Sequence, residues 1–121
     1  MPSITEYIDL KSAAIRDARS FRGEAVFLII KPGVDTGQAI SAVISDLVRF
    51  MSNSTGKMYN SHREPYSNAV RIEEPGHPSY GLKLVHDSGK IYIQPTAILQ
   101  DTDILRRYVQ RLRRIDATQP K

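Results

Sequence analysis

The sequence predicts an α+β fold with a mostly antiparallel sheet of about four strands and three helices, in the order α-β-α-β-β-β-α. Three patterns predict it: one run of six apolar residues at 25–30, three short alternating segments between 69 and 94, and segments with apolar residues at helical spacing. The 121 residues include no cysteine, so the core has to hold without disulfides. We expect a single α+β domain over residues 1–116 and a flexible C-terminal tail over 117–121.

The first predicted helix begins at Ser3 and runs to about Arg19. Ser3 and Glu6 have the spacing of a capping box, in which each side chain bonds a backbone N–H of the other residue. Apolar side chains then recur at steps of three and four, but Lys11 and Ser12 interrupt them. We therefore expect this helix to be less firmly docked than the other two.

The run from Ala25 to Ile30 predicts a central strand. Successive strand side chains point to opposite faces of a sheet, so Val26, Leu28 and Ile30 lie on one face while Phe27 and Ile29 lie on the other. Both faces then need cover. The first helix or a second copy of the chain has to supply it on the Phe27 side, which predicts a homo-oligomer.

The second predicted helix follows Lys31-Pro32-Gly33, with Asp35 or Thr36 as its N-cap, and closes within residues 52–56. It has the strongest helical periodicity in the chain, carried by Ile40, Val43, Ile44, Leu47, Val48, Phe50 and Met51. Residues 57–67 are polar and aromatic without a clear period. They predict a long loop, with at most a short strand near Met58, and such loops often carry a functional site.

Three alternating segments at 69–73, 80–85 and 90–94 predict an antiparallel meander. Pro75-Gly76-His77-Pro78 predicts its first connection, and Asp87-Ser88-Gly89 predicts a tight hairpin turn.

The last predicted helix starts at Asp101 or Thr102, where acidic side chains suit the positive end of the helix dipole. Its buried stripe is Ile104, Leu105, Tyr108, Val109, Leu112 and Ile115. Five of the chain's eleven arginines lie on its remaining surface: Arg106, Arg107, Arg111, Arg113 and Arg114. The modest positive charge of the chain, +4 from 17 basic and 13 acidic residues, is thus concentrated at this helix.

Guanidinium groups make bidentate, permanently charged contacts with phosphate. We therefore predict a small non-enzymatic binding protein that contacts an acidic partner, nucleic acid first of all, through this arginine-rich helix. Arg63, Arg16 and Arg19 extend the surface if the fold brings them alongside. The simpler interpretation of the same residues is a solvated helix face that complements the helix dipole.

Two other functions stay open at this stage. The first is a homo-oligomeric assembly or regulatory protein that binds another protein, as the two apolar faces of the central strand indicate. The second is a metal-independent phosphodiesterase or nuclease that uses His62 and His77 as an acid and a base. No metal-binding, phosphate-loop or nucleophile motif is present, so we expect no metal and no cofactor. No apolar run has the length of a membrane span, and the lack of cysteine predicts a cytoplasmic location.

Overall fold

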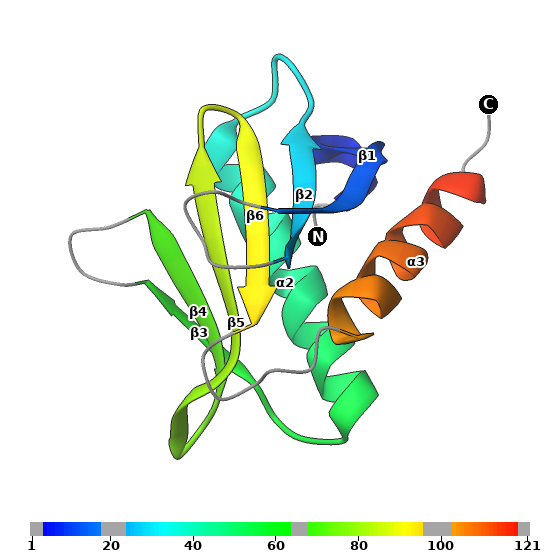
Figure 1. Cartoon of the computed structure of the whole chain (residues 1–121). Helices are drawn as coiled ribbons and strands as arrows, with labels where there is room; N and C mark the ends of the chain where they lie inside the picture. The colour runs from blue at the N-terminus through cyan, green and yellow to red at the C-terminus, as the bar shows by residue number, and fades with distance from the viewer. Residues whose placement is uncertain (1–3, 18–23, 64–67, 96–102, 119–121) are drawn as a thin grey trace.

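The computed structural model describes residues 4–17, 24–63, 68–95 and 103–118. Over these residues the chain is an α+β domain with one antiparallel sheet and three helices (Figure 1). The elements are α1 (Ile4–Tyr7), β1 (Ile8–Asp17), β2 (Glu24–Ile30), α2 (Thr36–Thr55), β3 (Asn60–Arg63), β4 (Ala69–Glu74), β5 (His77–Asp87), β6 (Lys90–Pro95) and α3 (Asp103–Ala117). The predicted α+β class is confirmed. The predicted strand number and element order are wrong, because the described part of the sheet has six strands rather than about four.

The sheet runs in the order β1-β2-β6-β5-β4-β3, so β1 and β3 form its two edges. One of the two additional strands, β3, lies inside the predicted loop at 57–67, and all four of its residues are exposed. It pairs with β4, with His62 opposite Arg71. An exposed strand has no buried face to impose alternation, which is why the sequence did not indicate it.

The other additional strand is β1, and it replaces most of the predicted first helix. Only Ile4–Tyr7 is helical, and Ile8–Asp17 is a strand that pairs with β2. The apolar residues of this segment fit both periods, since Ile8 and Leu10 alternate, as do Ala13 and Ile15. Pairing with the apolar strand β2 decides the outcome, because tertiary contacts override a weak helical stripe.

A bulge separates the two alternating halves of β1. Asp9 lies opposite Ile29 and Ala14 lies opposite Phe27, so the residues between them exceed what β2 can pair. The Ser12 hydroxyl accepts a hydrogen bond from the Ile29 amide at 2.9 Å and donates to the Asp9 carbonyl at 2.6 Å. The Ser12 side chain thus replaces backbone hydrogen bonds that the bulge removes from the β1–β2 pair. Ser12 is also one of the residues that interrupt the apolar stripe of the predicted helix.

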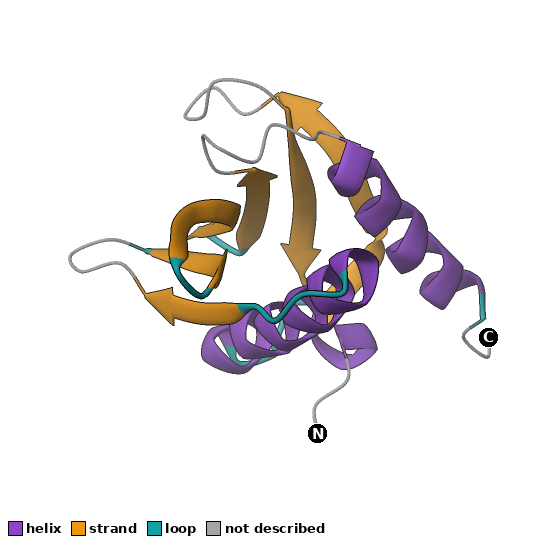
Figure 2. Ribbon diagram, turned by 90° about the horizontal axis from the view of Figure 1, so that it is seen from below, coloured by secondary structure: helices purple, strands orange, loops and turns teal. Residues whose placement is uncertain are grey.

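The two long helices lie on the same face of the sheet. Figure 2 shows the sheet curving around α2, with α3 beside it. Contacts of α2 with the sheet are mainly to β3 and β4, whereas α3 packs mainly on β1 and also touches β2 and β6. The predicted boundaries of α2 are confirmed: the Asp35 carboxylate accepts from the Gln38 amide, and Gly56 closes the helix with a φ of 72°. The helices and the sheet enclose a core that includes Val26, Leu28, Leu47, Ile93 and Leu112.

The opposite face of β2 carries Phe27 and Ile29, as alternation predicted. Phe27 is only 6% exposed, because Tyr92 packs against its ring at 5.5 Å and the Arg16 guanidinium stacks over it at 4.6 Å. Ile29 is 37% exposed. Phe27 is therefore buried within a single chain, without a first helix over it.

The predicted meander is confirmed as β4, β5 and β6, joined by a Pro75-Gly76 turn and a Ser88-Gly89 turn. Gly76 and Gly89 have φ values of 85° and 81°, which side chains disfavour. A Cβ on Gly81 would overlap the carbonyl oxygen of Ile72 on the next strand. This strand pair therefore requires glycine at position 81.

Candidate functional site

The arginines of α3 lie on its outer surface because the helix buries its other side. Its fully or largely buried residues are Ile104, Leu105, Tyr108, Val109 and Leu112. These residues confirm the predicted stripe, and Ile115 packs partly against the same core. The predicted start of this helix at Asp101 or Thr102 lies outside the described residues.

One of the five arginines, Arg111, forms an ion pair with the buried Asp46. Asp46 lies on the inner face of α2 and is 8% exposed. Its Oδ1 accepts from Nη2 of Arg111 at 2.7 Å, and its Oδ2 accepts from the Tyr108 hydroxyl at 2.8 Å. The Tyr108 ring also packs against Phe50 at 5.0 Å. Asp46, Tyr108 and the partly exposed Arg111, here called the triad, connect α2 to α3.

The protonation states of the triad follow from its surroundings. Burial raises the pKa of Tyr108 well above its ordinary value, and the neighbouring Asp46 carboxylate raises it further. The hydrogen bond to Asp46 raises the pKa of Arg111. The triad therefore holds a neutral phenol and a paired guanidinium. Breaking a buried pair by removing one partner is costly, so Arg111 is not free to turn toward a ligand.

Sequence reasoning missed Asp46, although a signal was present. The residue lies three positions after Val43 and four before Phe50, within the apolar stripe of its helix. An acid at a buried helical position needs a partner from another element. The sequence alone did not identify Tyr108 and Arg111 as that partner, since they are 62 and 65 positions away.

The other four arginines of α3 are exposed. Arg106 forms a 3.8 Å ion pair with Glu24, and Arg107 forms a 3.2 Å pair with Asp103 one helical turn earlier. Arg113 donates to the carbonyl oxygen of Ala13 at 3.3 Å. Arg114 makes no side-chain hydrogen bond or ion pair with the described residues.

The two exposed ion pairs do not prevent these arginines from binding another anion. The side chains in the Arg106–Glu24 pair are 58% and 40% exposed, and those in the Arg107–Asp103 pair are 47% and 65% exposed. Ion pairs of this kind contribute about 0–1 kcal/mol. A phosphate group can therefore replace the carboxylate at little cost.

The fold does not place Arg16 or Arg63 beside the exposed arginines of α3. Arg16 lies on β1, on the face opposite the residues that pack into the core, where it stacks on Phe27. Arg63 ends β3, at the sheet edge opposite β1. Arg19 lies outside the described residues. Of the predicted arginines that the structure describes, those exposed around α3 are therefore Arg106, Arg107, Arg113 and Arg114.

The two predicted catalytic histidines are separated by a strand. His62 lies on β3 opposite Arg71, with its Nε2 3.9 Å from Glu73. The backbone of His77 belongs to β5 and pairs with Glu74, on the other side of β4. The side chain of His77 lies outside the described part. Neighbouring strands are about 4.8 Å apart, so the two backbones are about 10 Å apart or more. The sheet thus does not bring the two residues together as neighbours.

Within the described ranges, no group of three or more His, Asp or Glu side chains could hold a metal ion. None of the described helices is long and apolar enough to cross a membrane. Comparison with protein-family models, with curated proteins and with solved structures found no match to this chain.

Proposed function

We propose that this chain is a small non-enzymatic binding protein that contacts an acidic partner, nucleic acid in the first instance, through α3. The observation that supports the proposal is the division of the arginines on this helix. Arg111 is held by the buried Asp46, whereas Arg106, Arg107, Arg113 and Arg114 are exposed on the same 15-residue helix. Four guanidinium groups so close together favour a partner with closely spaced negative charges.

Nucleic acid meets this requirement because its phosphates recur at short intervals along each strand. One guanidinium group can donate two parallel hydrogen bonds to the oxygens of one phosphate, and each such contact releases condensed counterions from the nucleic acid. Because the exposed residues that carry the proposal are arginines, the proposed contact is to the phosphate backbone. The cytoplasmic location predicted from the sequence remains part of the proposal.

The second candidate is a homo-oligomeric assembly or regulatory protein that binds another protein. Two observations favour it: β3 pairs with β4 alone among the described strands, and Ile29 is 37% exposed on the outer face of the sheet. Light scattering coupled to size-exclusion chromatography would test it. A strictly monomeric chain at high concentration would argue against self-association.

The nucleic-acid proposal can be tested with a variant that spares the two arginines bonded to Asp46 and to the Ala13 backbone. Arg106→Gln, Arg107→Gln and Arg114→Gln together leave Arg111 and Arg113 in place. We expect weaker binding of a labelled oligonucleotide and a shallower salt dependence. The slope of log K against log salt should fall by up to about 0.9 for each phosphate that the variant no longer neutralises. The measurement is a fluorescence anisotropy titration at two salt concentrations.

A charge-matched control is needed because any decrease in positive charge weakens polyanion binding. Arg49→Gln, Lys57→Gln and Lys90→Gln remove the same three charges from positions on α2, the loop after it and β6. If α3 is the contact surface, this control lowers the affinity less and keeps the wild-type salt slope. Equal effects of the two triple variants, or no effect of the α3 variant, would overturn the proposal.

A further inference from the structure

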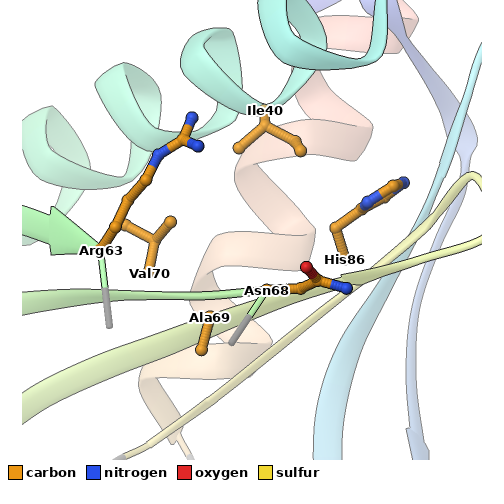
Figure 3. A pocket seen from close by; sticks show the side chains of 6 residues that line it. All are labelled: Ile40, Arg63, Asn68, Ala69, Val70 and His86. Carbon is orange, nitrogen blue, oxygen red and sulfur yellow. The ribbon is translucent and has the colours of Figure 1, made fainter. Parts of the chain in front are cut away.

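A small cavity lies between α2 and the sheet, on the β3 and β4 side. Its volume is about 100 Å³, and its lining residues are Ile40, Arg63, Asn68, Ala69, Val70 and His86. Figure 3 shows the side chains of Arg63, Asn68 and His86 arranged around the space below Ile40 of α2. One water needs about 10–15 Å³ of such volume, so the cavity has room for several waters or for one group of the size of a carboxylate or phosphate.

Each of the polar side chains that line this cavity, Arg63, Asn68 and His86, carries a hydrogen-bond donor, and none of the described residues that line it is acidic. The guanidinium of Arg63 makes no hydrogen bond or ion pair with the described residues, and the same holds for the side-chain amide of Asn68. Nε2 of His86 accepts a hydrogen bond from the Gly89 amide at 3.3 Å. The proton of the neutral imidazole therefore sits on Nδ1, which makes that nitrogen a donor as well.

The described carboxylates near the cavity do not satisfy Arg63. Arg63 also lines a wider, open hollow whose lining includes Glu6 and Asp35. Neither acid forms an ion pair with Arg63, and Asp35 is engaged as the N-cap of α2 through the Gln38 amide. No described group accepts a hydrogen bond from the Arg63 guanidinium, and no described acid lines the cavity. This arrangement is expected for a site that binds an anion.

We propose that this cavity binds a single oxyanion group, the carboxylate or phosphate of a small ligand, with Arg63 as its charged contact and Asn68 and His86 as additional donors. Val70 and Ile40 form an apolar wall beside these donors (Figure 3). The site lies on the far half of the sheet from β1, along which α3 packs. It is therefore independent of the proposed nucleic-acid surface.

The test is an NMR titration of the ¹⁵N-labelled full chain with inorganic phosphate and, separately, with acetate, at constant ionic strength set by chloride. We expect saturable shifts of the amide signals of Val70 and Gly89, with a dissociation constant in the millimolar range that suits a ligand of so few atoms. Saturation with phosphate alone assigns a phosphate group, and saturation with acetate alone assigns a carboxylate. Saturation with both supports a general oxyanion site, and saturation with neither overturns the proposal.

Two variants and one control make the assignment specific. Arg63→Gln removes the charge from an exposed position and should weaken binding by about tenfold or more. Ile40→Phe keeps every donor but fills the cavity, and it should also abolish saturation. Arg49→Gln removes an arginine of α2 that does not line the cavity, and it should leave binding unchanged. Wild-type affinity in Arg63→Gln, or an equal decrease in Arg49→Gln, would overturn the site.

Discussion

Two arginines approach the same helix, α2, and end in opposite environments. Arg111 comes from α3 and meets Asp46, whose two oxygens are both occupied by the triad. Arg63 comes from β3 and lines a cavity together with Ile40, which precedes Asp46 on α2 by less than two helical turns. None of the described residues that line this cavity is acidic. The Asp46 site, here called the closed site, has its carboxylate oxygens hydrogen-bonded within the protein. The Arg63 site is open, and no described group accepts from its donors.

The difference shows that arginine content alone does not define a binding surface. A buried carboxylate gives a partly exposed arginine a structural role, because separating the pair leaves a buried charge without a partner. An arginine next to an apolar wall keeps its donors for a ligand. The two cases can be separated experimentally, because the first governs stability and the second governs binding.

The largest expected effect is that of removing the acid from the closed site. Asp46→Ala leaves the Tyr108 hydroxyl buried without an acceptor and Arg111 without its anion, so we expect a loss of about 3 kcal/mol in the free energy of unfolding. Urea denaturation followed by circular dichroism measures it. Ser45→Ala, at the exposed neighbouring position of α2, is the control and should change stability by less than about 0.5 kcal/mol. If Asp46→Ala lowers the free energy of unfolding by less than about 1 kcal/mol, the triad does not hold α2 and α3 together.

The second prediction compares the two arginines directly. Arg111→Gln leaves the buried Asp46 with the Tyr108 hydroxyl as its remaining described side-chain partner, and it should cost about 1–3 kcal/mol. Arg63→Gln removes no described hydrogen bond or ion pair and should change the free energy of unfolding by less than about 0.5 kcal/mol. Thermal and urea denaturation of both variants test this contrast. Similar destabilisation in the two would mean that Arg63 also has a structural role.

How far the sequence predicts this fold depends on burial. The stripe on α2 and the three strands of the meander are confirmed, because each buries one face against the core and so imposes a clear period. The Asp35 and Gly56 caps are confirmed because capping depends on local backbone geometry. Strand β3 was missed because it buries neither face. The segment from Ile8 to Asp17 was misassigned because its bulge shifts the phase of alternation by several residues, which imitates helical spacing.

The sequence predicted the candidate sites only as far as local periodicity allowed. The sequence identified α3 as the arginine-rich element, and the local stripe was enough to place those side chains on its outer surface. It did not separate Arg111 from its neighbours, since that depends on Asp46 from a different helix. It likewise grouped Arg63 with α3, whereas the strand order places it at the opposite edge of the sheet. Pairings between distant elements are not encoded in local periodicity.

The smallest effect concerns the phenol of the closed site and depends on pH. Tyr108→Phe removes one hydrogen bond to Asp46 and should cost about 1 kcal/mol near neutral pH, where the tyrosine is protonated in both the folded and the unfolded chain. Because burial raises the pKa of Tyr108 in the folded protein, only the unfolded chain ionises as the pH rises above about 10. The wild type then loses up to about 1.4 kcal/mol of stability per pH unit from this group, and the phenylalanine variant loses none from it. Urea denaturation from pH 8 to 11 should therefore show the stability gap between the two proteins closing above about pH 10, while other groups cancel in the difference. Parallel curves across that range would show that Tyr108 ionises as easily in the folded chain as in the unfolded one, and that the closed site admits water.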